Sequence, residues 1–234
     1  EPQPPRGDDR HRQRSTLQRT ITPPVLPAHR RRTLAVVASL VALTLFTRTR
    51  TIGRVFVGDI VNPLDTDAHY HLRRALLTLR DFPHVPRVDP LFGWPSGSTP
   101  TWPPGFDQLL ALPPWLGGLS GDAASASRWM MFVPVALGVA LCLVTRAIAR
   151  RVAAGRPHAE AIGWSAGVLC AVIPQAVAIT AVGSTDHHGA EALAAALTLY
   201  WLLAWDPSTD VPVRRRWELL GAALFFVSVR IYCG

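Results

Sequence analysis

The chain has 234 residues, 49% of them hydrophobic, and a formal net charge of +8. In a soluble protein this charge would indicate nucleic-acid binding. Here the apolar residues form long blocks and arginines flank those blocks, which excludes that class of partner and indicates a membrane protein.

The chain begins with an arm, Glu1 to Arg32, that is rich in proline, arginine and polar residues. Because it has little to bury, we predict a disordered, basic cytoplasmic segment that contacts anionic lipid headgroups or only sets the topology. The first apolar block, Leu34 to Thr47, is short for a bilayer core of roughly 30 Å and also suits a signal peptide. No small-residue cleavage pattern follows it, so we predict a retained membrane anchor.

Four further apolar blocks follow a long polar and aromatic segment. They are Trp129 to Thr145, Ala161 to Val182, Gly189 to Trp205 and Trp217 to Val229. The first three are almost free of charge and about long enough to cross a bilayer. We therefore predict an all-α polytopic membrane protein with about four complete spans and a truncated fifth.

The arginine-rich links around Arg150 and Arg215 predict the orientation, because short cytoplasmic links carry an excess of positive charge. The N-terminus then lies in the cytoplasm, and a long loop, 48–128, and the turn around Asp186 lie outside. Three arginines at the start of the long loop oppose this assignment, but loops longer than about 60 residues obey the rule poorly. They are Arg48, Arg50 and Arg54.

A first polar cluster opens the long loop, between Asp65 and Arg74, where the residues predict a helix start. Helical spacing places Asp67, His71 and Arg74 on one face. Carboxylates suit a divalent cation and guanidinium groups suit anionic oxygens, so the cluster could form a metal and phosphate site. The alternative is an N-capped, salt-bridged helix at the membrane interface.

A second polar cluster lies in the short link between the third and fourth apolar blocks. It contains Asp186, His187 and His188, with Glu191 one turn inside the next block. Ionisable groups at the edge of a span are costly and are therefore functional candidates. The alternative is a helix start capped by Asp186 with solvated histidines.

The predicted topology places both clusters on the external face. A site made from Asp67, Asp186 and His188 would offer oxygen ligands and one imidazole, which favours Mg²⁺ or Mn²⁺ over Zn²⁺. The segment between the clusters, 81–118, is crowded with Pro, Gly and Trp. It suits either an interfacial layer or a wall over the site.

Four motifs carry a resemblance to a known family. They are Asp67-Ala68-His69-Tyr70-His71-Leu72-Arg73, Trp94-Pro95-Ser96-Gly97, Trp102-Pro103-Pro104, and Asp186-His187-His188 with Gly183 and Glu191. Over roughly 65–205 the chain resembles the catalytic subunits of oligosaccharyltransferases. The resemblance implies a membrane glycosyltransferase fold of the GT-C type for 33–234, in a prokaryotic cytoplasmic membrane.

The resemblance also implies a reaction. Asp67 and Asp186 would be catalytic and, with His188, would bind Mn²⁺ or Mg²⁺, which engages the (pyro)phosphate of a polyprenyl-linked saccharide donor. The glycan would pass to an acceptor protein. Donor contacts are expected from five more side chains: His71, Arg74, Trp102, His187 and Glu191.

Two departures from the family pattern set further expectations. Ile179 stands where many members carry an arginine, and the chain stops at Gly234, before a later acidic loop and a soluble C-terminal domain. We therefore expect the N-terminal part of a longer enzyme, inactive alone. A truncated non-catalytic membrane protein and a metal-binding or transport protein remain the alternatives.

Overall fold

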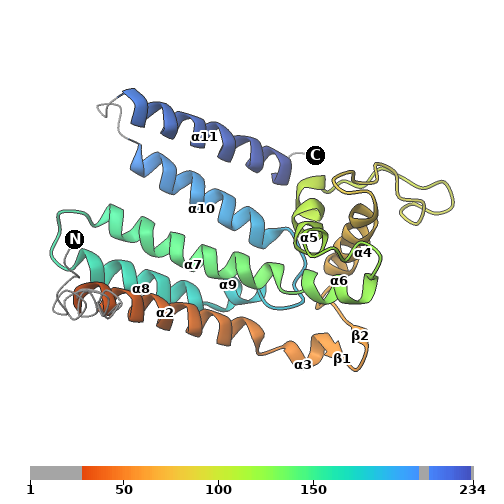
Figure 1. Cartoon of the computed structure of the whole chain (residues 1–234), viewed down its shortest axis with the longest axis horizontal. Helices are drawn as coiled ribbons and strands as arrows, with labels where there is room; N and C mark the ends of the chain where they lie inside the picture. Colours follow the sequence, from red (N-terminus) through yellow and green to blue (C-terminus); the bar gives the residue numbers. More distant parts are fainter. Residues whose placement is uncertain (1–27, 206–210, 233–234) are drawn as a thin grey trace, which may run out of the picture. The chain divides into compact units, whose positions relative to one another are not determined.

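A computed structural model of the chain describes residues 28–205 and 211–232 (Figure 1). Most of the predicted basic arm therefore lies outside the described residues. The chain divides into a unit that ends at Val37 and a unit that begins at Ala38. The described part of the first unit is helical, and the fold below is that of the second unit.

Almost all of the regular structure is helical. The helices are α2 (Ala28–Thr49), α3 (Ile52–Val55), α4 (Thr66–Arg80), α5 (Pro104–Leu116), α6 (Ala123–Met130), α7 (Val133–Val152), α8 (Ala159–Val172), α9 (Pro174–Ala178), α10 (His188–Ala204) and α11 (Val211–Tyr232). Two short strands, β1 (Phe56–Val57) and β2 (Ile60–Val61), pair antiparallel with Phe56 opposite Val61. The predicted helical class is thus confirmed.

Two helical stretches within the described residues are long and apolar enough to cross a membrane. They are Arg30–Val55 and Ala123–Val152, while α8 is apolar but shorter. The predicted count of four spans and a fifth is therefore not established. One predicted block is wrong as a continuous helix: Ala161 to Val182 breaks after Val172 and becomes irregular after Ala178.

Proline explains the break between α8 and α9. Pro174 has no N–H, so the carbonyl of Cys170 lacks its helical partner. The guanidinium of Arg48 donates to that carbonyl at 3.1 Å, to the carbonyl of Ala171 at 2.7 Å and to the hydroxyl of Thr180 at 3.0 Å. Arg48, fully buried, therefore caps the end of α8.

Two layers of packing position the site. Along the bundle, α7 packs against α8 and α10, and α10 packs against α11 (Figure 1). At one end of α7, α4 packs against α5 and α6 around Leu72, Phe106, Leu110 and Met130. Each large apolar side chain buried in this way stabilises the fold by roughly 1.5–3 kcal/mol. The helices of the long loop thus share one core with α7, where Val133 and Val135 join it, and with Ala190 of α10.

Candidate functional site

The turn that precedes α10 is held by three other parts of the chain. The backbone N–H of Val182 donates to the carbonyl of Arg48 at 2.9 Å, and that of Gly183 donates to the carbonyl of Met131 at 3.1 Å. The hydroxyl of Thr185 donates to the carbonyl of Ala68 in α4 at 2.9 Å. These bonds bring the two polar clusters of the sequence into contact.

Gly183 is required for this close approach. Its φ is +83°, a backbone conformation that L residues with side chains rarely adopt. A Cβ at this position would also lie 2.5 Å from a methyl group of Val55. Any larger residue would therefore push the turn away from α3.

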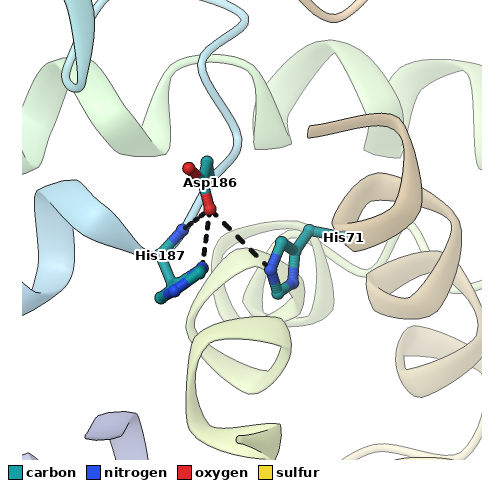
Figure 2. Close-up of side chains that lie close together, drawn as sticks. All are labelled: His71, Asp186 and His187. Carbon is teal, nitrogen blue, oxygen red and sulfur yellow. Dashed lines mark hydrogen bonds and ion pairs between the residues drawn. The ribbon is translucent and has the colours of Figure 1, made fainter. Parts of the chain in front are cut away.

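Asp186 is the centre of the candidate site. Figure 2 shows its carboxylate between His71 of α4 and His187 of the turn. Oδ1 of Asp186 lies 2.6 Å from Nδ1 of His187 and 4.0 Å from Nε2 of His71. Oδ2 lies 3.4 Å from Nε2 of His188. Three imidazoles thus surround one half-buried carboxylate.

Glu191 lies one turn into α10, beneath the two histidines of the turn. Its carboxylate oxygens lie 3.7 Å from Nε2 of His187 and 3.2 Å from Nδ1 of His188. The sequence predicted this placement from the spacing of three and four residues. A second carboxylate therefore joins the same group of imidazoles.

Charge and burial act in opposite directions on the Asp186–His187 pair. Burial raises the pKa of Asp186. The hydrogen bond and the charge of His187 lower it by more, so the pKa of Asp186 falls below its usual value. The carboxylate of Asp186 raises the pKa of His187 against the effect of burial, and the charges of Glu191 and Asp67 add to it. Each group therefore favours the charged form of the other.

His71 is fully buried and is held from behind by a residue that sequence reasoning missed. Its Nδ1 lies 2.8 Å from Oδ1 of Asp107, and Oδ2 of Asp107 lies 3.0 Å from Nη1 of Arg74. Both carboxylate oxygens therefore face α4. The available signal was the one charged residue in the mostly apolar stretch Pro104–Leu116, but an acid in a first helical turn is also common for local reasons.

Trp102 completes the wall behind His71. Its ring centroid lies 6.0 Å from that of His71 and 4.9 Å from that of Tyr70. Its carbonyl accepts a hydrogen bond of 2.9 Å from Nη1 of Arg74. Desolvation raises the pKa of Tyr70 to about 12, so its phenol stays protonated. The predicted donor contacts Arg74 and Trp102 are thus engaged with each other.

The ligand-type atoms fit a divalent cation. Two groups of three residues each place their ligand atoms within 4.8 Å of one another. One group is His71, Asp186 and His187, and the other is His187, His188 and Glu191. Nε2 of His71 is buried, faces Asp186 and has no hydrogen-bond partner among residues 28–205 and 211–232. Imidazole nitrogen with carboxylate oxygen suits Mn²⁺ and Zn²⁺.

Asp67, predicted as a metal ligand, joins neither of these groups among the residues that the structure describes. It is half-buried at the start of α4, and its charge acts on His187. The structure thus places it beside the site, and its role as a ligand remains a prediction.

The fold and the site define a class: a helical protein with membrane-length helices and a carboxylate–imidazole site between its longest loop and the turn before α10. No family model matches the chain. In sequence it is 29% identical over 182 residues, 75% of its length, to dolichyl-phosphooligosaccharide-protein glycotransferase 1 of Archaeoglobus fulgidus. The match covers 28% of that relative.

Solved structures extend the likeness to the fold. The oligosaccharyltransferase AglB of A. fulgidus, in complex with an inhibitory peptide and a dolichol-phosphate, is 21% identical with a TM-score of 0.74, covering 85% of this chain and 23% of that one. A complex of the A. fulgidus oligosaccharyltransferase with Zn and sulfate is also 21% identical with a TM-score of 0.74, covering 84% and 25%. The chain therefore resembles the AglB-like oligosaccharyltransferases in sequence and fold, as its motifs predicted, and spans about a quarter of their length.

Proposed function

We propose that this chain is part of a membrane glycosyltransferase of the oligosaccharyltransferase type. The reaction would move a glycan from a polyprenyl-(pyro)phosphate donor to an acceptor protein on the non-cytoplasmic face. The contact between α4 and the Asp186 turn carries this proposal, because it gathers carboxylates and imidazoles from both motifs at one point. The A. fulgidus relatives, which bind a dolichol-phosphate and a peptide, support the proposed substrates.

The proposed cofactor is a divalent cation, Mn²⁺ or Mg²⁺. We assign Asp67, Asp186 and His188 as its ligands, following the family resemblance. The mixture of carboxylate and imidazole around Asp186 favours Mn²⁺ over Mg²⁺, and the Zn complex of the relative supports binding of a metal with imidazole affinity. When bound, the cation acts as a Lewis acid on the departing phosphate.

His187 is the side chain best placed to hold the donor. It lies between Asp186 and Glu191, at 2.6 and 3.7 Å, and these carboxylates raise its pKa and so favour the protonated imidazole. A protonated imidazole donates charge-assisted hydrogen bonds to phosphate oxygens. We therefore assign His187 to the donor, together with His188 where the metal leaves it free.

The proposed setting is a prokaryotic cytoplasmic membrane, with the N-terminus inside and the site outside. The arginine-rich links support this orientation. Arg48, which opposed it in the sequence, is fully buried and hydrogen-bonded to carbonyls. Because Arg48 caps a helix inside the protein, it does not count among the loop arginines that indicate the topology.

Metal-dependent donor binding tests this function. Membranes or detergent micelles that contain the whole chain are titrated with a short-chain polyprenyl diphosphate-linked saccharide, with and without Mn²⁺. Asp186→Asn keeps the size of the side chain and removes its charge. We expect binding that requires Mn²⁺ and weakens roughly 100-fold or more in the variant, since losing a residue that only orients a ligand already costs about 10–100-fold.

Asp59→Asn is the matched control, because Asp59 is a fully exposed acid in the turn between β1 and β2. It should bind the donor like the unmodified chain. Donor binding that ignores both Mn²⁺ and the Asp186 substitution would contradict the proposed function. Transfer of the saccharide to a peptide in the same membranes then reports the complete reaction.

A further inference from the structure

We propose that His71 is a nitrogen ligand of the cation at Asp186, and that Asp107 is the positioning residue that holds it there. The inference rests on the proposed function, since it concerns the same cation. It assigns to His71 a role other than the predicted donor contact. It gives Asp107, which no motif included, a role in the site.

The imidazole of His71 is fixed on one side. Its Nδ1 lies 2.8 Å from Oδ1 of Asp107, and both side chains have no exposed surface. Phe106 packs edge-on against the ring with centroids 5.1 Å apart. A carboxylate at Nδ1 favours the tautomer with hydrogen on Nδ1, because a carboxylate can only accept. The lone pair is then on Nε2.

The opposite nitrogen has no partner within the described part of the protein. Nε2 of His71 is buried without a hydrogen bond, although buried polar atoms are nearly always paired. It faces Oδ1 of Asp186 at 4.0 Å, too long for a hydrogen bond. Two atoms that share a cation of bond length near 2.1 Å can lie about this far apart.

The three residues form an arrangement typical of metal sites. A ligating histidine usually donates its second ring nitrogen to a carboxylate, which fixes the tautomer and increases the basicity of the ligand. Here the series of contacts would run from Asp107 through His71 to the cation. Arg74 holds the second oxygen of Asp107 at 3.0 Å, so that carboxylate is itself fixed.

The neighbouring pair on α4 offers a matched control. Arg73 pairs with Asp89 as Arg74 pairs with Asp107, and both aspartates are buried. Asp89 has no contact with His71 or with either group of ligand atoms. Asp89→Asn therefore breaks an ion pair of the same type on the same helix without touching the proposed metal ligand.

The experiment measures Mn²⁺ binding to the whole chain in detergent. Binding is followed by the loss of the electron paramagnetic resonance signal of free Mn²⁺. We expect Asp107→Asn to weaken Mn²⁺ binding about 10–100-fold, the usual effect of losing a residue that orients a ligand. His71→Gln, which removes the ligand itself, should weaken it at least as much. Asp89→Asn should bind Mn²⁺ within about twofold of the unmodified chain. Circular dichroism and elution volume establish which variants remain folded.

Pulsed resonance of the bound Mn²⁺ gives a readout that a merely structural role would not move. Nitrogen coupling from imidazole should weaken in His71→Gln, because one directly bound ring is lost. If Asp107→Asn does not fold, the double variant Arg74→Met with Asp107→Leu removes the buried charges together and should still bind Mn²⁺ weakly. His71→Gln replaces no buried charge and is a third test.

The outcomes separate this inference from the proposed function. Undiminished affinity and nitrogen coupling in His71→Gln would overturn the inference, as would equal losses in Asp89→Asn and Asp107→Asn. If Mn²⁺ binding still depends on Asp186 in that case, the proposed function stands. Mn²⁺ binding that is absent, or indifferent to Asp186, would overturn both.

Discussion

Two buried arginines are held in opposite ways. Arg48, at the end of α2, donates to two carbonyl oxygens and two hydroxyls and has no carboxylate among its partners within the described residues. Arg74, in α4, forms an ion pair with Asp107. Both are nearly or fully buried, at 0% and 5% exposed. The two environments therefore stabilise the same charge by different means.

The difference shows which structural role each arginine has. The carbonyl end of a helix carries partial negative charge, so a cation there is stabilised without a counter-ion. Arg48 uses this at a helix end created by Pro174, and its own carbonyl holds the turn before α10. Arg74 instead neutralises a carboxylate that also binds His71. One arginine supports the backbone of the site, and the other supports its chemistry.

Removing Arg74 should have the largest effect on stability. Arg74→Met leaves Asp107 as a buried carboxylate without its guanidinium partner, which costs about 3–5 kcal/mol. The measurement is heat- or SDS-induced unfolding in detergent micelles. Adding Asp107→Leu should recover most of the loss, because a buried ion pair replaced by apolar residues is often neutral. A double variant no more stable than Arg74→Met would contradict the ion-pair description.

The sequence allowed part of the site to be predicted, and the physical reason is spacing. The groups on α4 and the contact of Glu191 with the histidines follow from helical periodicity. Asp107 did not follow, because its contacts lie 36 residues away from it in the sequence, at His71. Contacts between elements depend on how helices pack, which a local pattern does not contain.

The break in the third apolar block was missed for a related reason. The block is apolar and long enough for a membrane span, yet Pro174 ends the helical hydrogen bonding. A proline within an apolar block can kink or end a helix, and only the partner that satisfies the freed carbonyl decides between them. That partner, Arg48, lies 122 residues away from Cys170 in the sequence.

Removing Arg48 should cost less than removing Arg74 but should not be rescued by a second substitution. Arg48→Met leaves buried carbonyls unpaired, at about 1–3 kcal/mol for each buried group. We expect a loss of about 3 kcal/mol in unfolding free energy. Arg50→Met, two residues along and exposed, should stay within about 0.5 kcal/mol. Equal losses at the two positions would mean that the capping contacts contribute nothing.

Close packing around Arg48 sharpens the comparison, because none of the glycines that the structure describes lies against Arg74. A Cβ at Gly138 would lie 2.6 Å from Nε of Arg48 and 2.7 Å from the hydroxyl of Thr180. Gly138→Ala should therefore cost about 1–3 kcal/mol, the usual effect of overpacking. Gly53→Ala, where nothing lies within 4 Å of the added carbon, is the control and should be neutral or stabilising. An unchanged unfolding midpoint in Gly138→Ala would show that the cap tolerates displacement.

A third arginine, Arg73, tests how far the stabilisation by an ion pair depends on burial of both partners. Its partner Asp89 is buried, but the side chain of Arg73 is 36% exposed, so solvent screens the pair more than the Arg74 pair. The hydrogen bond from Arg73 lowers the pKa of Asp89 against the effect of burial, with further bonds from the backbone of Leu91 and Phe92.

The pH dependence of that pair should give the smallest effect. Because the folded pKa is lowered, the stabilisation is present above the unfolded pKa of about 3.9 and is lost as pH falls through the folded value. Asp89→Asn should lose about 1 kcal/mol at neutral pH, as expected for a partly exposed pair. Its difference from the unmodified chain should shrink as pH falls below the unfolded pKa and vanish below the lowered folded pKa, since both chains then carry a neutral group. Unfolding midpoints measured across this range decide the matter: a difference that persists in acid would assign the effect to the hydrogen bonds of the loop and not to the charge of Asp89.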